Sequence, residues 1–248
     1  MAEQSRFNTV AGQYAAGRPN YPAELFDALS ADLGRPLCGI DALDLGAGPG
    51  IASRQLAERG ARVTALELSG PMLAQLVSHS PGVRAVQGSV HALPFRGDTA
   101  DLITCAQAWH WIDPETGVPE VRRVLRPGGI FAAWWNFTQR DSDWEAEQEQ
   151  RIARAVPNWA DYQISTNSRK DFDTEDGFGL VAARHQFSWE REVPVERHLQ
   201  NLNSKSYIAE LADPVAFLAM ERELLLGVFP AGVVTERFGT ELITARER

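Results

Sequence analysis

Residues 42–50 read Ala-Leu-Asp-Leu-Gly-Ala-Gly-Pro-Gly, and this stretch decides the fold. An apolar run ends in three glycines at alternate positions, Gly46, Gly48 and Gly50, and residues 51–59 then have the pattern of an amphipathic helix. Glycine permits positive φ and lets a ligand approach the backbone without a Cβ in the way. A buried strand, a glycine turn and a helix in this order predict the entry to a nucleotide-type site.

The next strand, predicted over residues 62–67, ends in an acid. Glu67 lies 19 residues after Gly48, about the spacing at which a carboxylate reaches a ribose diol. A dinucleotide-binding loop reads Gly-x-Gly-x-x-Gly. Here the spacing is Gly-x-Gly-x-Gly, and Pro49 removes one N–H from the loop. This loop therefore suits a nucleoside with an uncharged or zwitterionic tail better than a pyrophosphate.

Strands and helices alternate through residues 40–140, which predicts βαβ units, a parallel sheet and helices on both faces. Because ligands of such sheets lie beyond the carboxyl ends of the strands, residues just after each strand are the site candidates. The predicted strands are 41–46, 62–67, 83–88, 100–106 and 129–135, and the predicted helices are 51–59, 71–79 and 113–125. Farther along, a helix is expected at 143–156, strands at 185–193 and 234–245, and a broken helical stretch at 195–227.

Composition narrows the class of partner. The 248 residues suit one α/β domain with an insertion. Asp and Glu outnumber Lys and Arg by 33 to 24 without a dense basic run, which argues against a nucleic-acid partner. The two cysteines give no disulfide or metal spacing. Without an apolar leader or an apolar run of about 18 residues, we expect no membrane association and a cytoplasmic protein.

The glycine stretch followed by Glu67 resembles the first two motifs of class I S-adenosylmethionine-dependent methyltransferases. Further resemblance covers about residues 5–140. Gly88-Ser-Val-His-Ala-Leu-Pro-Phe95 is similar to the segment after the third strand, and residues 101–107 and 123–130 resemble the fourth strand and the turn into the fifth. Residues 7–14 and 18–22 resemble the start of a small-molecule methyltransferase subgroup. Ser89 departs from the family pattern, which often has Asp there.

The resemblance implies a Rossmann-like sheet of seven strands, mostly parallel, with an antiparallel C-terminal hairpin and a helical cap. Residues 1–248 would form one domain, with lid helices in residues 1–30 and a cap in about residues 157–232 that the sixth strand crosses. The implied activity is methyl transfer from S-adenosylmethionine to O, N or C of a small organic metabolite, giving S-adenosylhomocysteine. A monomer or homodimer without a metal is expected.

The resemblance also assigns roles near the cofactor. Glu67 would accept hydrogen bonds from the ribose hydroxyls, and Asp44 would support the loop or bind the methionine amino group. Leu68 and Met72 would pack near the adenine, unless they are ordinary core residues. The full set of expected cofactor-binding residues is Asp44, Gly46, Ala47, Gly48, Glu67, Leu68, Met72, Ser89, Val90 and Gln107.

Residues that follow the fourth and fifth strands are candidates to face the transferred methyl. His110 is a candidate general base, since histidine accepts a proton near neutral pH; the alternative is a histidine that orients its loop. Aromatic walls attract a sulfonium by cation–π interaction, but consecutive Trp134 and Trp135 must point to opposite sheet faces. The expected substrate and lid residues are Tyr14, Arg18, Tyr21, Trp109, Trp111, Trp134 and Trp135. Arg18 would bind a carboxylate of the cofactor or the substrate.

Two other functions remain open at this point. A nicotinamide-dependent oxidoreductase shares the strand–loop–helix entry, although the glycine spacing argues against it. A protein of the same fold that binds S-adenosylmethionine without transferring its methyl group would carry the same cofactor motifs.

Overall fold

A seven-stranded sheet organises the chain, and its order is β3-β2-β1-β4-β5-β7-β6. The computed structural model describes residues 18–247 apart from 140, 158, 160–179 and 206. The strands β1 to β5 are parallel, whereas β7 runs antiparallel to both β5 and β6. This is the mostly parallel sheet with an antiparallel C-terminal hairpin that the family resemblance implies. The strands are β1 (Asp41–Leu45), β2 (Arg62–Glu67), β3 (Arg84–Gln87), β4 (Ala100–Ala106), β5 (Leu125–Thr138), β6 (Leu180–Pro194) and β7 (Val233–Glu247).

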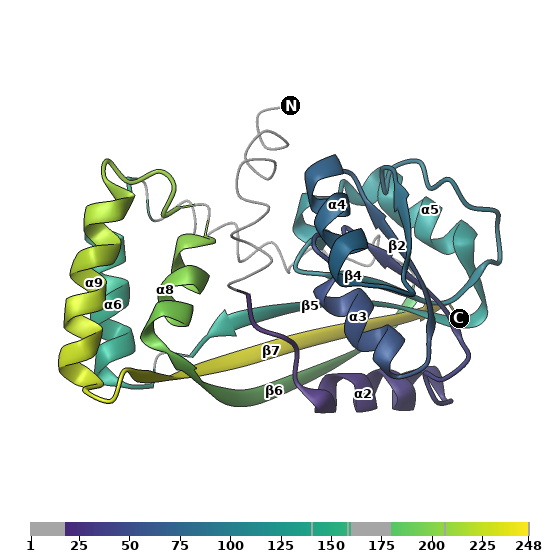
Figure 1. The fold of residues 1–248 in the computed structure, drawn as a ribbon. Helices are drawn as coiled ribbons and strands as arrows, with labels where there is room; N and C mark the ends of the chain where they lie inside the picture. Colours follow the sequence, from purple (N-terminus) through teal and green to yellow (C-terminus); the bar gives the residue numbers. More distant parts are fainter. Residues whose placement is uncertain (1–17, 140, 158, 160–179, 206, 248) are drawn as a thin grey trace.

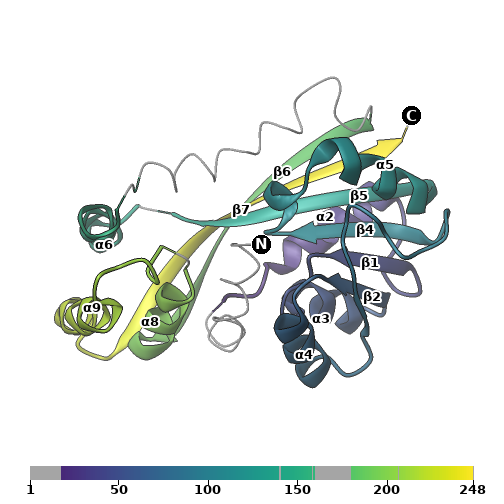
Figure 2. The ribbon, with the colours of Figure 1, turned by 90° about the horizontal axis from the view of Figure 1, so that it is seen from above.

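Helices cover both faces of the parallel strands, as Figures 1 and 2 show. Residues from α2 and α3 pack on one face together with Leu102 and Trp134, while α5 packs on the other with Phe131 and Trp135. Trp134 and Trp135 therefore point to opposite faces, as predicted. The helices of this part are α2 (Ala23–Leu33), α3 (Ile51–Glu58), α4 (Gly70–His79) and α5 (Pro114–Val124).

The outer ends of β5, β6 and β7 run beyond the parallel part toward a second group of helices (Figure 1). These helices are α6 (Asp143–Ala155), α8 (Val195–Asn203) and α9 (Pro214–Val228), called here the helical layer. Their packing forms separate apolar clusters, one around Ile152 and Ile208 and one around Leu199 and Leu225. Among the described helices, none has the length and apolar character needed to cross a membrane.

The strand β5 is longer than the predicted strand at 129–135. At its start, Leu125 already pairs with Ala100, and an irregularity follows before Ile130 pairs with Leu102. At its end, residues 135–138 pair with the antiparallel β7. The extra length therefore comes from partners distant in sequence, which the local pattern does not reveal.

The predicted lid in residues 1–30 falls partly outside the described residues. The described part includes α2, whose Leu25, Phe26 and Leu29 are buried against the sheet. Within the predicted cap at 157–232, the structure describes β6, α8 and α9. The two domain assignments stay predictions.

Candidate active site

The glycine loop joins β1 to α3 in a conformation that requires glycine. Gly46, Gly48 and Gly50 have φ values of +60°, +56° and +85°, in the left-handed region that other residues rarely adopt. A Cβ on Gly46 would lie 2.8 Å from the Cβ of Ala108. The N–H of Ala47 donates to the Leu66 carbonyl at 3.1 Å, which ties the loop to β2.

Glu67 ends β2 beside this loop. Its Oε2 accepts a hydrogen bond from the Gly48 N–H at 2.8 Å, and its Oε1 accepts one from the Ser69 N–H at 2.7 Å. A carboxylate oxygen can accept about two hydrogen bonds, so each oxygen keeps capacity for a ligand hydroxyl. The backbone thus fixes the orientation of an acid that lines a cavity.

Asp44 lies under the loop and is fully buried. Its two carboxylate oxygens accept hydrogen bonds from Ser53 Oγ at 2.5 Å and Thr104 Oγ1 at 2.7 Å. Burial raises the pKa of Asp44 to about 6, although both hydroxyl donors act to lower it. These bonds join β1, α3 and β4, which favours the loop-supporting role among those predicted.

A cavity of about 300 Å³ opens at the carboxyl ends of the parallel strands. Leu68 and Trp111, each 48% exposed, present large apolar surfaces there, while Met72 and Val90 are buried at its wall. No Lys or Arg is found among the described residues that line it. The cavity brings together most of the predicted cofactor residues: Gly46, Gly48, Glu67, Leu68, Met72, Ser89, Val90 and Gln107.

Gln107 stands between this cavity and a smaller one. It has a φ of 58°, unusual for a residue other than glycine. Its N–H donates to the Trp134 carbonyl at 2.8 Å, and its Nε2 donates to the Asn136 carbonyl at 3.3 Å. Gln107 lines both cavities, so the bend after β4 brings its side chain to their junction.

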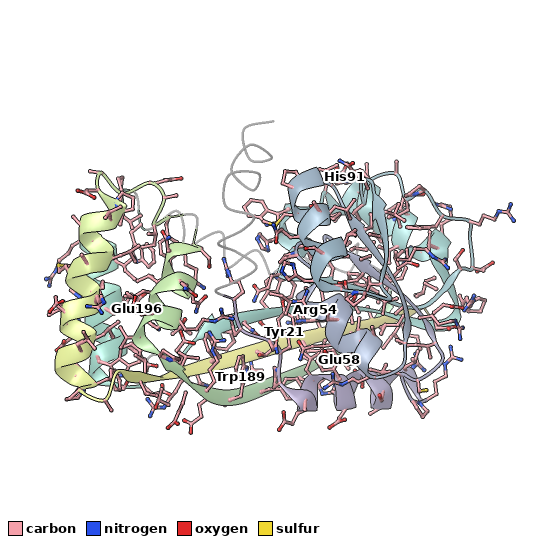
Figure 3. All side chains as sticks on the ribbon, in the orientation of Figure 1. Tyr21, Arg54, Glu58, His91, Trp189 and Glu196 are labelled. Carbon is pink, nitrogen blue, oxygen red and sulfur yellow. The ribbon has the colours of Figure 1, made fainter. Side chains whose placement is uncertain are left out.

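The smaller cavity, of about 60 Å³, lies between the glycine loop and the start of the helical layer. Arg18, Tyr21, Asn136 and Lys205 are among the residues that line it. Figure 3 shows Tyr21 near the middle of the molecule, away from His91 at the upper end of the α/β part and Glu196 in the helical layer. The two cavities share Gly46, Gly48, Ala106 and Gln107, so they adjoin.

His110, the candidate base, belongs to the short 3-10 helix after β4. Its Nδ1 accepts a hydrogen bond from Trp135 Nε1 at 3.2 Å, and its ring lies 4.5 Å from that of Trp111. His110 is not among the residues that line either cavity. Its role as a base stays a prediction, and the observed contacts favour a role in orienting the loop.

The predicted aromatic wall divides into different environments. Trp134 is fully buried against Tyr21 and Phe26, and Trp109 packs against Phe131 at 4.7 Å between ring centroids. Trp135 is also buried and lines neither cavity. Among the four tryptophans, Trp111 is the one found at a cavity.

Three further residues bear on the comparison between the predicted site residues and the residues found at the cavities. Tyr14 lies outside the described residues. Asn136 and Lys205 line the smaller cavity but were not among the predicted site residues. Asn136 directly follows the fifth predicted strand, and the rule that ligands lie beyond the carboxyl ends of strands could have identified it as a site residue. Lys205 follows α8 and has no local motif; it reaches the cavity through long-range packing.

The comparisons with known proteins agree with this geometry. Residues 43–133 match the model of a methyltransferase domain. An uncharacterized methyltransferase of Mycobacterium tuberculosis is 32% identical over 226 residues, covering 91% of this chain and 87% of the relative. The chain therefore belongs to the class I S-adenosylmethionine-dependent methyltransferase family.

Solved structures give the same fold. A methyltransferase structure from Anaeromyxobacter dehalogenans has a TM-score of 0.73 and 26% identity, covering 93% of this chain and 97% of that one. Phosphoethanolamine N-methyltransferase 2 of Haemonchus contortus, solved with S-adenosylmethionine, has a TM-score of 0.51 and 15% identity. It covers 97% of this chain and 57% of that one, and this likeness concerns the fold alone.

Proposed function

We propose that this chain binds S-adenosylmethionine in the larger cavity and transfers its methyl group to a small organic acceptor. The observation that carries the proposal is the cavity itself. It joins a backbone-held carboxylate, a glycine loop and two exposed apolar surfaces at the carboxyl ends of the strands. Family membership supports the reaction, and the acceptor class is our inference.

The residues present fit the cofactor. Glu67 would accept the ribose hydroxyls, because each of its oxygens keeps hydrogen-bonding capacity beyond its bond to the backbone. Leu68 and Trp111 would cover the faces of the adenine, with Ser89 and Val90 near its edge. The methionine end would lie along the glycine loop, where Gly46 and Gly48 lack the Cβ that would block it.

The chemistry needs little from the protein beyond placement. When bound, S-adenosylmethionine supplies an electrophilic sulfonium methyl to an oxygen, nitrogen or carbon nucleophile. Gln107 and the glycine loop border both cavities and would orient the acceptor beside the cofactor. His110 would act mainly by orienting the loop that holds Trp111, as its contacts favour, and the alternative is a general base on the acceptor.

Calorimetric titration with S-adenosylmethionine, S-adenosylhomocysteine and NADPH tests the cofactor assignment. We expect the first two to bind and NADPH not to bind, because the larger cavity has no described cation at its wall to pair with a pyrophosphate. Binding of NADPH alone would contradict the proposal. Binding of S-adenosylmethionine without turnover of any acceptor in a labelled-methyl assay would instead favour a non-transferring role.

A further inference from the structure

The smaller cavity is cationic although the protein is acidic overall, with a formal net charge of −9. Arg18 and Lys205 both line it, and no Asp or Glu is among its described lining residues. Arg18 reaches this position from the segment before α2, where its Nη2 donates to the Ser204 carbonyl at 3.3 Å. Two cations from opposite parts of the chain therefore meet at one small space.

Lys205 is a partly buried cation whose charge is not neutralised by a salt bridge with any described residue. The pKa of Lys205 is lowered to about 7, first by burial and then by the positive charges of Arg18 and Arg191, while Glu236 opposes this shift. Desolvation without a partner is unfavourable for an ammonium group. An anion in the cavity would relieve this cost.

Glu236, the acid whose charge favours the protonated form of Lys205, is already bound to other donors. Glu236 accepts hydrogen bonds from His198 Nδ1 at 2.8 Å, Arg191 Nε at 2.6 Å and Asn201 Nδ2 at 3.3 Å. Their attraction outweighs burial and lowers the pKa of Glu236. The carboxylate of Glu236 is therefore occupied by these three donors and does not form a salt bridge with Lys205.

Asn136 adds a donor whose direction is fixed by a hydrogen-bonded chain. Trp189 Nε1, which can only donate, donates to Thr240 Oγ1 at 2.8 Å. Thr240 Oγ1 then donates to Asn136 Oδ1 at 2.6 Å. Because the oxygen of this amide is occupied, its NH₂ group is the end left to a ligand. Asn136 lines the same cavity as Lys205.

We propose that Lys205, Arg18 and the amide of Asn136 form a subsite for a carboxylate of the methyl acceptor, which makes the acceptor a small organic acid. This inference rests on the proposed function and deepens it. The small cavity adjoins the larger one at Gly46, Gly48, Ala106 and Gln107. An acid anchored there extends its remaining atoms toward the junction where the methyl group would be transferred.

The test compares Lys205→Met with Lys205→Arg and with Arg222→Met. Lys205→Met removes the charge at similar length, and Lys205→Arg restores it. Arg222→Met removes an exposed charge of α9 that pairs with Glu196 and lines neither cavity. The probes are succinate, malonate, hexanoate and 3-phenylpropionate, each paired with its primary amide and titrated into each protein saturated with S-adenosylhomocysteine.

We expect at least one acid to bind the wild type about 10- to 100-fold more tightly than its amide, as for charge-assisted hydrogen bonds. Lys205→Met should abolish this preference, while Lys205→Arg and Arg222→Met keep it. Above pH 7, binding to the wild type should also take up a proton, because the bound acid favours the charged ammonium. Titrations in two buffers of different ionisation enthalpy measure this uptake, which Lys205→Met should lose.

Absence of any preference for acids in the wild type would overturn the inference, as would an unchanged preference in Lys205→Met. A carboxylate in this subsite could also belong to the cofactor. In that case, Lys205→Met would weaken S-adenosylhomocysteine but not methylthioadenosine, which lacks the carboxylate, and the assignment to the acceptor would be wrong. Failure of S-adenosylhomocysteine to bind the wild type would instead reject the proposed function itself.

Discussion

The cofactor end of the molecule, at the carboxyl ends of the parallel strands, and the helical layer use polar groups in different ways. At the cofactor end, backbone N–H groups of the glycine loop and β2 hold Glu67, and the described walls of the larger cavity carry no Lys or Arg. In the helical layer and in the part of β7 beside it, buried side-chain charges pair with one another, with Glu221 of α9 at 0% and Glu236 of β7 at 3% exposure. The geometry of the cofactor end is therefore set by residues close together in the sequence, whereas that of the helical layer depends on pairs of residues far apart in the sequence.

The largest effect is expected from breaking a buried pair in the helical layer. Glu221 accepts hydrogen bonds from Arg151 Nε at 2.6 Å and Gln148 Nε2 at 2.9 Å. Glu221→Ala should lower the free energy of unfolding by about 3–5 kcal/mol, because it leaves a partly buried charge without its partner. Urea denaturation measures this loss, and calorimetry should find S-adenosylhomocysteine affinity unchanged.

The matched control for this change is Glu223→Ala, which removes an exposed carboxylate from the same helix. It should alter the free energy of unfolding by less than about 0.5 kcal/mol. Equal losses in the two variants would mean that the buried pair adds nothing, and a loss of cofactor binding in Glu221→Ala would mean that the two ends are not separable.

At the cofactor end, Asp44 predicts a dependence of stability on pH. Its folded pKa of about 6 lies above the ordinary aspartate pKa of 3.8. The unfolded chain therefore releases this proton first as the pH rises, and stability falls between about pH 4 and pH 6. With about 1.4 kcal/mol for each pKa unit, the full decrease is about 3 kcal/mol.

Asp44→Asn should remove this decrease, so that the variant loses less stability than the wild type between pH 4 and pH 7. Urea denaturation across that range measures the difference. Asp27→Asn, at an exposed position of α2, should keep the wild-type dependence. Parallel curves for the wild type and Asp44→Asn would show that Asp44 is ionised in the folded protein throughout.

Glu67→Ala tests whether the acid held by the glycine loop contributes to cofactor binding. It should weaken S-adenosylhomocysteine binding by about 1.5–3 kcal/mol, the typical value for hydrogen bonds to a charged group. Calorimetry measures the affinity, with Glu58→Ala on the exposed side of α3 as the control. Wild-type affinity in Glu67→Ala would remove this residue from the site.

The smallest effect is expected from His110→Ala. A general base contributes about 10²–10⁴-fold to the rate, but His110 Nδ1 already accepts from Trp135 and the ring lines neither cavity. We therefore expect a slowing of less than about 10²-fold, measured as kcat in a labelled-methyl assay with cofactor binding intact. A larger loss would identify His110 as the base.

The cofactor end could be predicted in detail because its features are local. The glycines and Glu67 are separated by short, regular intervals, and the alternation of strands and helices places them at one edge of the sheet. The burial of Trp134 could not be predicted, since it depends on Tyr21 and Phe26 packing against its ring. Lys205 was missed because its meeting with Arg18 joins segments that no local pattern relates.

Strand β7 runs from the helical layer to the core of the sheet, and the exact number of its residues decides which face each side chain occupies. Glu236, Phe238, Thr240 and Leu242 follow one another at steps of two, so their side chains share one face of the strand. They belong in turn to the charge network, the smaller cavity, the chain that orients Asn136 and the core. A deletion of one residue would turn all those beyond it to the opposite face. Evolution can therefore exchange side chains along this strand far more readily than it can add or remove one, and changes in length should accumulate in the turn at residues 230–232 instead.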